Sequence, residues 1–188
     1  MNKEDRFWQW FGDSKVVDEE GYPTVLFHGT SRDFSSFSTS TFGETSGYHA
    51  ADVGFFATAI PELASMYADK SAKGGLGQNI MPIFVTIKNP MFYETSSQYY
   101  RHIDLLKKNG ISGKEWREKL ESEGFDGIIV RDDKEEVIAF KPEQIKSAIG
   151  NVGLFNPNSP SLTDHPMHEP KKAKEKNKKI SLDTNFGI

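Results

Sequence analysis

The sequence predicts an α+β domain in which most strands are antiparallel and helices are inserted between them. Short apolar runs of strand length alternate with stretches of helical periodicity, and the runs at residues 126–131 and 136–140 are separated by a short polar turn typical of a hairpin. No internal repeat is present, and the order of elements does not indicate βαβ units. The 188 residues suit one domain, which we expect at residues 1–160, followed by a lysine-rich tail at residues 161–188.

The N-terminal part predicts one helix and the first strand. Aromatic residues recur at three- and four-residue spacing between Glu4 and Phe11, which predicts a short amphipathic helix that ends at Gly12. Thr24-Val25-Leu26-Phe27 predicts a buried strand that carries His28-Gly29-Thr30 at its end. Residues 31–47 follow no steady period and are rich in Ser, Thr, Gly and Phe. Irregular segments of this length are often functional.

The middle of the chain predicts a strand, a helix and a second strand. Residues 54–58 form a short apolar run, and Pro61 at a first-turn position opens a helix that we expect to reach about Lys70. The following glycine-rich segment, 73–77, lacks the spacing of a phosphate-binding P-loop and predicts a simple turn. Residues 80–88 predict the next strand, with a proline nearer its start than its middle, as proline in a sheet requires.

Two further helices precede the hairpin. We expect them at residues 97–108, ended by Gly110, and at residues 114–121, where Ser112 and Glu115 match a capping box. After the hairpin, Pro142-Glu143-Gln144-Ile145 predicts a helical turn, and we expect disorder after about Thr163.

Composition excludes several classes of protein. The chain contains no cysteine, so it has neither disulfides nor thiolate metal ligands, and this composition is typical of a reducing compartment. No apolar run approaches the length that spans a bilayer, so we expect a cytoplasmic protein with no membrane partner. The region from residue 164 onward carries six lysines against four acidic residues, whereas the rest carries 17 basic and 23 acidic residues. An acidic body argues against a dominant phosphate-binding surface.

Glu136 is the most informative residue of the hairpin. Side chains alternate along a strand, so Glu136 shares a face with Ile138 and Phe140, whereas Glu135 points to the other face. A carboxylate at the edge of an apolar face suggests a cleft in which it meets a ligand, because an unpaired buried charge costs several kcal/mol. The alternative is an ordinary strand-end glutamate in water.

Several motifs in this chain resemble the ADP-ribosyltransferase superfamily, specifically its histidine-tyrosine-glutamate branch, which includes poly(ADP-ribose) polymerases and diphtheria toxin. They are His28-Gly29-Thr30, Gly54-Phe55-Phe56 followed by Tyr67 eleven residues after Phe56, and Glu136 before an apolar run. The chain is most similar to the ADP-ribosyltransferase-like domains of phage and prophage polyvalent proteins. That likeness covers residues 7–160 and rests on these segments: Phe11-Gly12-Asp13-Ser14-Lys15-Val16-Val17-Asp18, His28-Gly29-Thr30, Ile87-Lys88-Asn89-Pro90, Gly124-Phe125-Asp126-Gly127-Ile128 and Glu143-Gln144-Ile145-Lys146-Ser147-Ala148-Ile149-Gly150-Asn151.

The resemblance implies a split, mostly antiparallel pair of sheets around an NAD cleft with flanking helices, and NAD+ as co-substrate without a metal. It assigns the binding of the dinucleotide to His28-Gly29-Thr30. Gly29 would bind the nicotinamide carboxamide through its backbone, and His28 would contact the adenine-side ribose. A structural histidine is the alternative for His28.

The resemblance also assigns the stacking and catalytic positions. Phe56 and Tyr67 match the two positions that sandwich the nicotinamide ring, with phenylalanine in place of the commoner tyrosine at position 56. Core packing is the alternative for both, and we prefer it for Phe55. Glu136 matches the catalytic glutamate, with Glu135 as a rival that points to the wrong face. The branch that modifies arginine would need an acid at position 134, where Lys134 stands.

The leading hypothesis is therefore an enzyme that cleaves NAD+ and transfers ADP-ribose to a macromolecular acceptor, with protein favoured and nucleic acid a further candidate. One alternative is an NAD glycohydrolase, in which water is the acceptor. Another is a catalytically inactive binding or interaction module of phage origin. A nucleic-acid accessory protein that acts through its lysine tail is the third alternative.

Overall fold

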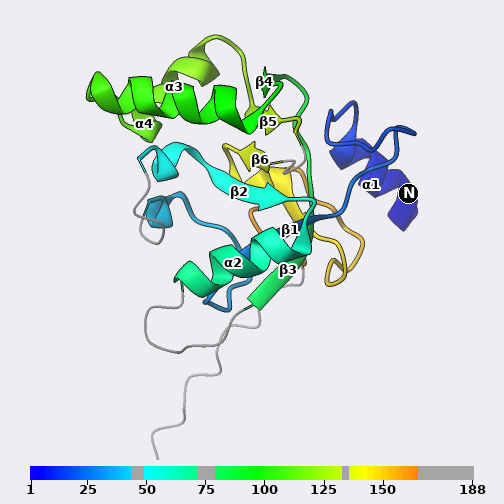
Figure 1. Cartoon of the computed structure of the whole chain (residues 1–188). Helices are drawn as coiled ribbons and strands as arrows, with labels where there is room; N and C mark the ends of the chain where they lie inside the picture. The colour runs from blue at the N-terminus through cyan, green and yellow to red at the C-terminus, as the bar shows by residue number, and fades with distance from the viewer. Residues whose placement is uncertain (44–48, 72–78, 133–135, 165–188) are drawn as a thin grey trace, which may run out of the picture.

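The computed structural model describes residues 1–43, 49–71, 79–132 and 136–164. These residues form one seven-stranded sheet in the order β4-β5-β6-β2-β1-β3-β7, with helices packed against it (Figure 1). The strands are β1 (Leu26–Thr30), β2 (Phe55–Thr58), β3 (Asn79–Val85), β4 (Pro90–Tyr93), β5 (Gly127–Val130), β6 (Glu136–Ala139) and β7 (Ile145–Ser147). The helices are α1 (Lys3–Phe11), α2 (Pro61–Ser71), α3 (Ser96–Lys108) and α4 (Gly113–Ser122), with short 3-10 turns η1 (Thr39–Thr41), η2 (Ala51–Val53) and η3 (Pro142–Gln144).

The sheet is mostly antiparallel, which confirms the predicted α+β class. Among the described strands only β4 and β5 pair in parallel, whereas β5 and β6 form the predicted antiparallel hairpin. The residues 73–77 and 133–135, and the predicted disorder beyond residue 164, lie outside the described residues.

The structure confirms the predicted helices. They were predictable because the residues that start and end them lie close together in the sequence. A capping box between Asn2 and Asp5 starts α1, and Gly12 ends it with a positive φ of 58°. The capping box at the start of α4 joins Ser112 to Glu115 as expected. Each cap satisfies backbone groups that the helix itself leaves unpaired.

Two strands have different bounds from those predicted. The first strand was expected at residues 24–27, but β1 is Leu26–Thr30, because all five of its residues lie opposite β3. His28-Gly29-Thr30 is therefore part of the strand and not its end. The strand expected at residues 80–88 is Asn79–Val85, and Pro82 lies in its middle. The position is tolerated because the Pro82 carbonyl accepts a hydrogen bond from Ala148, just beyond β7, so the missing N–H faces away from the β1 ladder.

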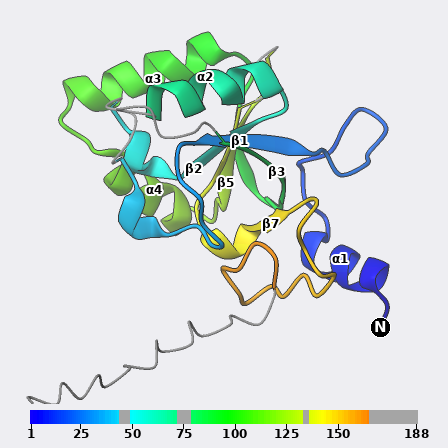
Figure 2. The ribbon, with the colours of Figure 1, turned by 90° about the horizontal axis from the view of Figure 1, so that it is seen from below.

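Two cores lie on opposite faces of the sheet. Ile128, Val130 and Ile138 of β5 and β6, and Phe140 just after β6, pack with Tyr99, Leu106, Trp116 and Leu120 of α3 and α4. Ile129, Val137 and Ala139 pack into the other core cluster. This alternation is the one predicted for the strand of Glu136. Figure 2 shows that α2 and α3 lie on the same side of the sheet. Side chains from these two helices can therefore meet above one strand.

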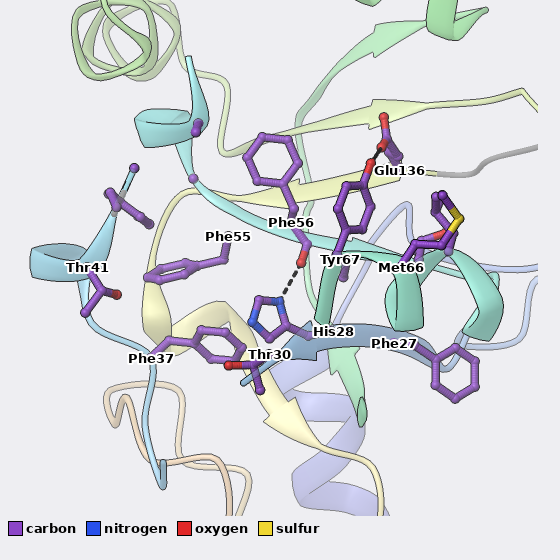
Figure 3. A pocket seen from close by; sticks show the side chains of 18 of the residues that line it. Phe27, His28, Thr30, Phe37, Thr41, Phe55, Phe56, Met66, Tyr67 and Glu136 are labelled. Carbon is purple, nitrogen blue, oxygen red and sulfur yellow. Dashed lines mark hydrogen bonds between the residues drawn. The ribbon is translucent and has the colours of Figure 1, made fainter. Parts of the chain in front are cut away.

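The sheet has a seam between β1 and β2. In the described residues these strands pair only at Phe27 and Thr58, whereas β1 pairs with β3 at five positions. Beyond Phe27 the two strands diverge, and the side chain of His28 reaches across to the backbone of Phe56 (Figure 3). The seam marks off two parts, β4-β5-β6-β2 and β1-β3-β7, but the pair Phe27–Thr58 joins them, so the two sheets expected from the resemblance form one seven-stranded sheet.

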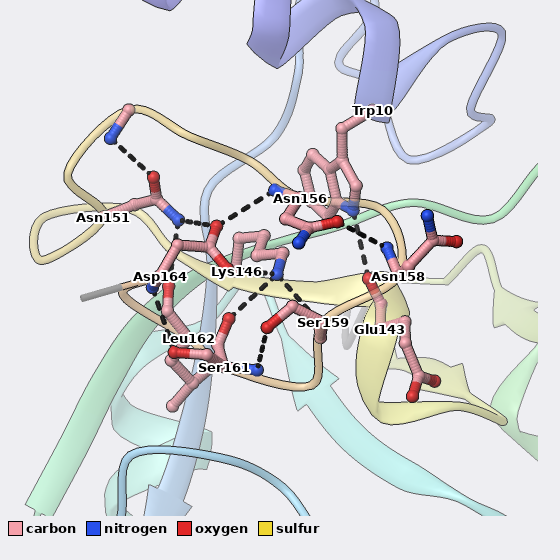
Figure 4. A network of polar contacts seen from close by, with 11 residues as sticks. Trp10, Glu143, Lys146, Asn151, Asn156, Asn158, Ser159, Ser161, Leu162 and Asp164 are labelled. Carbon is pink, nitrogen blue, oxygen red and sulfur yellow. Dashed lines mark hydrogen bonds and ion pairs between the residues drawn. The ribbon is translucent and has the colours of Figure 1, made fainter. Parts of the chain in front are cut away.

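A buried polar network fixes the last described segment against β7 (Figure 4). The ammonium group of Lys146 donates to the carbonyl oxygens of Ser159 and Ser161, at 2.8 and 2.9 Å, and to Oδ1 of Asp164 at 3.1 Å. Burial opposes ionisation of Asp164, but hydrogen bonds from Asn151 and Lys146 hold its pKa below the usual range. The packed chain therefore continues to Asp164, past the boundary expected at residue 160.

Candidate active site

A cavity of about 900 Å³ opens at the seam between β1 and β2. The six residues predicted for the site all line it: His28, Gly29, Thr30, Phe56, Tyr67 and Glu136. They come from β1, β2, α2 and β6, which are distant in sequence, so the fold brings the predicted set together. The rival Glu135 and Lys134 lie outside the described residues.

Glu136 is not a solvated strand-end glutamate. Its residue is only 3% exposed, and its carboxylate accepts a hydrogen bond at Oε1 from the Tyr67 hydroxyl at 2.7 Å. A second hydroxyl, from Tyr100, donates to Oε2 at 3.4 Å. Buried charges persist where such donors replace water. The structure thus holds a carboxylate with both oxygens engaged at the wall of the cavity.

Tyr67 reaches Glu136 because α2 packs very closely on β1. Ala64 and Ala68 are fully buried at this contact, one turn apart, and Tyr67 lies beside them on the helix. Burial raises the pKa of Tyr67 well above its usual range, and the negative charge of Glu136 adds to the shift. The phenol therefore stays protonated and remains a donor.

Gly29 is required by this close packing. A Cβ at this position would lie 1.8 Å from the carbonyl oxygen of Ala64. The resemblance implied a role for the Gly29 backbone in ligand binding, whereas the structure places the backbone of α2 against the side where a side chain would lie. The importance of Gly29 was predicted, but its physical reason is helix-to-strand packing.

The backbone polar groups of Gly29 nevertheless face the seam. Opposite residues in an antiparallel pair either exchange hydrogen bonds or both point away. Pro82 directs its carbonyl to Ala148, so Phe27, which lies opposite Pro82, must point its N–H and C=O away from β3. Gly29, two residues further, points the same way, toward the side of β2. Its amide and carbonyl can therefore serve a ligand in the cavity.

His28 is held in one tautomer by the neighbouring strand. Its Nδ1 lies 2.7 Å from the carbonyl oxygen of Phe56, which can only accept, so Nδ1 carries the proton. Burial lowers the pKa of His28, and the neutral ring has Nε2 as an acceptor. The ring packs edge-on against Phe34 and Phe37. His28 thus combines a structural hydrogen bond with a place in the cavity wall.

Different contacts fix the side chains of Thr30, Phe55 and Phe56. The Thr30 hydroxyl accepts from the backbone N–H of Arg32 at 3.1 Å and so fixes the turn after β1. Phe55 is buried in the core, with ring centroids 4.9 Å from Phe37 and 4.4 Å from Phe42, as we expected for this residue. Phe56 is half-buried, and Figure 3 shows it beside Tyr67 on the opposite face of β2 from Phe55.

The wall contributed by α3 was not predicted from the sequence. Tyr99, Tyr100, Ile103, Asp104 and Lys107 of this helix line the cavity. Tyr100, Asp104 and Lys107 are spaced by four and three residues, which places them on one face of the helix. That spacing was readable, but the position of the face above Glu136 depends on tertiary packing.

Comparison with protein-family models matches residues 18–155 to the family described as ADP-ribosyltransferase in polyvalent proteins. The chain belongs to this family. The match includes every cavity residue named above and excludes α1. Comparisons with curated proteins and with solved structures give no match.

In this ADP-ribosyltransferase domain, the cavity at the β1–β2 seam is the candidate substrate cleft. Enzymes of this family use NAD+ as substrate, and the cavity offers aromatic faces, the Gly29 backbone and one buried carboxylate. Within the described residues, no group of three or more His, Asp or Glu side chains could hold a metal ion. No helix in the described part of the chain is long and apolar enough to cross a membrane.

Proposed function

We propose that this ADP-ribosyltransferase domain cleaves NAD+ between nicotinamide and ribose and transfers ADP-ribose to a macromolecular acceptor. The observation that carries the proposal is the carboxylate of Glu136, buried at the cavity wall and held by the hydroxyls of Tyr67 and Tyr100. We favour protein over nucleic acid as acceptor. We also propose a cytoplasmic setting, on the composition of the chain alone.

The site residues divide the work of holding NAD+. The nicotinamide ring lies against Phe56 and Tyr67, where each ring contact contributes about 0.5–1.5 kcal/mol. The amide and carbonyl of Gly29 hydrogen-bond the carboxamide, which has a complementary donor and acceptor. His28, with Nε2 unprotonated, accepts a hydrogen bond from a hydroxyl of the other ribose. Support for these roles comes from the lining of the cavity, from the contact that fixes the His28 tautomer, and from the direction of the Gly29 backbone groups.

Glu136 supplies the charge that the reaction needs. Its carboxylate accepts a hydrogen bond from the 2′-hydroxyl of the nicotinamide ribose, and this contact strengthens as positive charge develops at the anomeric carbon. The bond from C1′ to the ring nitrogen breaks, and its electron pair leaves with neutral nicotinamide. The nucleophile of the acceptor then forms a bond to C1′ and releases its proton to solvent. Each step requires only groups that the chain, NAD+ and the acceptor provide.

Incubation of the protein with NAD+ labelled on the ADP-ribose part, together with a host lysate, tests the proposal. We expect nicotinamide release and labelled macromolecules. Glu136→Gln should lower turnover about 100- to 1000-fold, the scale of one lost preorganised electrostatic contact. Glu118→Gln is the matched control, because this α4 side chain is 58% exposed and lies outside the cavity lining.

The outcomes separate the candidate activities. Nicotinamide with label only in free ADP-ribose would make the protein a glycohydrolase, with water as acceptor. Absence of nicotinamide release from the wild-type protein would reject catalysis and favour a binding module. A Glu136→Gln protein with the wild-type rate would remove Glu136 from the mechanism.

A further inference from the structure

Tyr100 is a second tyrosine partner of Glu136, and no motif in the chain identified it. Its hydroxyl lies 3.4 Å from Oε2, whereas the Tyr67 hydroxyl takes Oε1 at 2.7 Å. The two tyrosines come from different helices, α3 and α2, which lie on the same side of the sheet (Figure 2). Each oxygen of Glu136 therefore has a tyrosine partner from a separate element, and the hydroxyls of Tyr67 and Tyr100 also interact with each other.

The start of α3 is tied to the hairpin that carries Glu136. The Thr95 side chain caps the helix by accepting from the N–H of Gln98, and the N–H of Ser96 donates to the carboxylate of Asp132, which follows β5. Tyr100 lies in the second turn from this cap. The hydrogen bond between Ser96 and Asp132 thus links α3 to the hairpin, four residues before Tyr100 on one side and four residues before Glu136 on the other.

The ring of Tyr100 is held independently of its hydroxyl. It packs edge-on against Tyr99, with centroids 5.3 Å apart, and Tyr99 is 3% exposed in the core beneath α3. Tyr100 itself is 42% exposed. Removal of the hydroxyl alone therefore leaves the ring contact in place and creates no cavity in the core.

A carboxylate oxygen can accept two hydrogen bonds, so Tyr67 and Tyr100 leave one position on each oxygen of Glu136 for substrate. With a single tyrosine, the carboxylate could rotate about its terminal bond, since such sp³–sp² torsions are broad. A second donor on the other oxygen restricts this rotation. The distance of 3.4 Å is long for a hydrogen bond between oxygens, so the restraint is weaker than that of Tyr67.

We infer that Tyr100 is a positioning residue for the ADP-ribosyl transfer step: its hydroxyl orients Oε2 of Glu136 toward the ribose without binding NAD+ itself. The inference rests on the proposed function of Glu136. It adds α3 to the elements that build the reactive site, beside β1, β2, α2 and β6.

Tyr100→Phe tests the inference. We expect kcat for nicotinamide release to fall about 10-fold, the lower end for one hydrogen bond to a charged group. KM for NAD+ should stay within about twofold, because ground-state binding does not depend on the hydroxyl. Tyr22→Phe is the matched control, since Tyr22 is 66% exposed and does not line the cavity. Thermal unfolding of both variants checks that the fold is intact.

A double-mutant cycle separates action through Glu136 from an independent role. If Tyr100 acts through the carboxylate, Tyr100→Phe in a Glu136→Ala background causes no further loss of nicotinamide release. An equal loss in both backgrounds, a raised KM with unchanged kcat, or a Tyr100→Phe protein with wild-type kcat would overturn the inference. A wild-type protein that releases no nicotinamide would instead overturn the proposed function, and the inference with it.

Discussion

Replacement of Gly29 by alanine is expected to damage both the fold and the site. The new methyl carbon would lie 1.8 Å from the carbonyl oxygen of Ala64, whereas ordinary contacts begin at 3.4 Å. The backbone of α2 would have to move by about 1.6 Å, the difference between these distances. Overpacking of this kind costs about 1–3 kcal/mol or more, and we expect about 3 kcal/mol because the obstacle is backbone.

The same displacement reaches the reactive carboxylate. Tyr67 is carried by α2, and its hydroxyl bonds Glu136 at 2.7 Å, so a movement of that size breaks the contact. Urea unfolding followed by tryptophan fluorescence measures the stability, and nicotinamide release measures the activity. We expect both to fall in Gly29→Ala.

Gly110→Ala provides the matched control. Gly110 has a φ of 69°, and no atom of the described residues lies within 4 Å of the position that its Cβ would take. Alanine there adds only backbone strain of about 1–2 kcal/mol. We expect this variant to keep its activity. A Gly29→Ala protein that unfolds within about 1 kcal/mol of wild type would refute the packing argument.

Three further predictions concern the polar side chains of Tyr67, Asp164 and His28. Tyr67→Phe keeps the ring but loses the hydrogen bond to Glu136, so kcat should fall about 10- to 100-fold. Because the pKa of Tyr67 is raised, its ionisation should cause no loss of wild-type activity near pH 10, the usual tyrosine pKa. A loss of activity at that pH would count against Tyr67 as the hydrogen-bond donor to Glu136. Asp164→Asn removes the negative charge that pairs with the buried ammonium of Lys146 and should cost about 3–5 kcal/mol in urea unfolding. The pKa of Asp164 is lowered in the folded state, so its stabilisation of the fold is present above about pH 4 and is lost on acidification. The free energy of unfolding of Asp164→Asn should therefore fall less steeply at acid pH than that of the wild type. An equally steep fall in both proteins would contradict this. The pKa of His28 is also lowered in the folded state, so the wild-type protein loses stability as pH falls below about 6.5. His28→Gln should lose less stability than the wild type between pH 7 and 5, as measured by urea unfolding at both pH values.

Local signals predicted the helices and the hairpin well. Ser112 and Glu115 define the start of α4 within four residues of sequence, and Gly12 ends α1 in the same local way. The strands β4 and β7 were not predicted. They have only four and three residues, and β4 gains its partner β5 across 37 residues of chain, so no local pattern marks them.

The candidate site was predictable where a motif carries the chemistry. Glu136 was identified from its strand and its resemblance, and the structure places it in the cavity with Tyr67. Tyr100 could not be identified in this way, because its contact with Glu136 depends on how α3 packs on the sheet. Gly29 shows a third case, in which the residue was predicted and its packing partner, Ala64, was not.

The seam between β1 and β2 also links substrate binding to the rigidity of the whole sheet. A dinucleotide that touches both strands would act as a removable cross-link where the described ladder has only the pair Phe27 and Thr58. Binding to the folded state alone adds about 2.7 kcal/mol of stability when the ligand is present at 100 times its Kd. Backbone amides of β1 and β2 should then exchange with solvent more slowly than those of distant strands. Bound NAD+ would thus strengthen the same β1–β2 junction that forms its binding site.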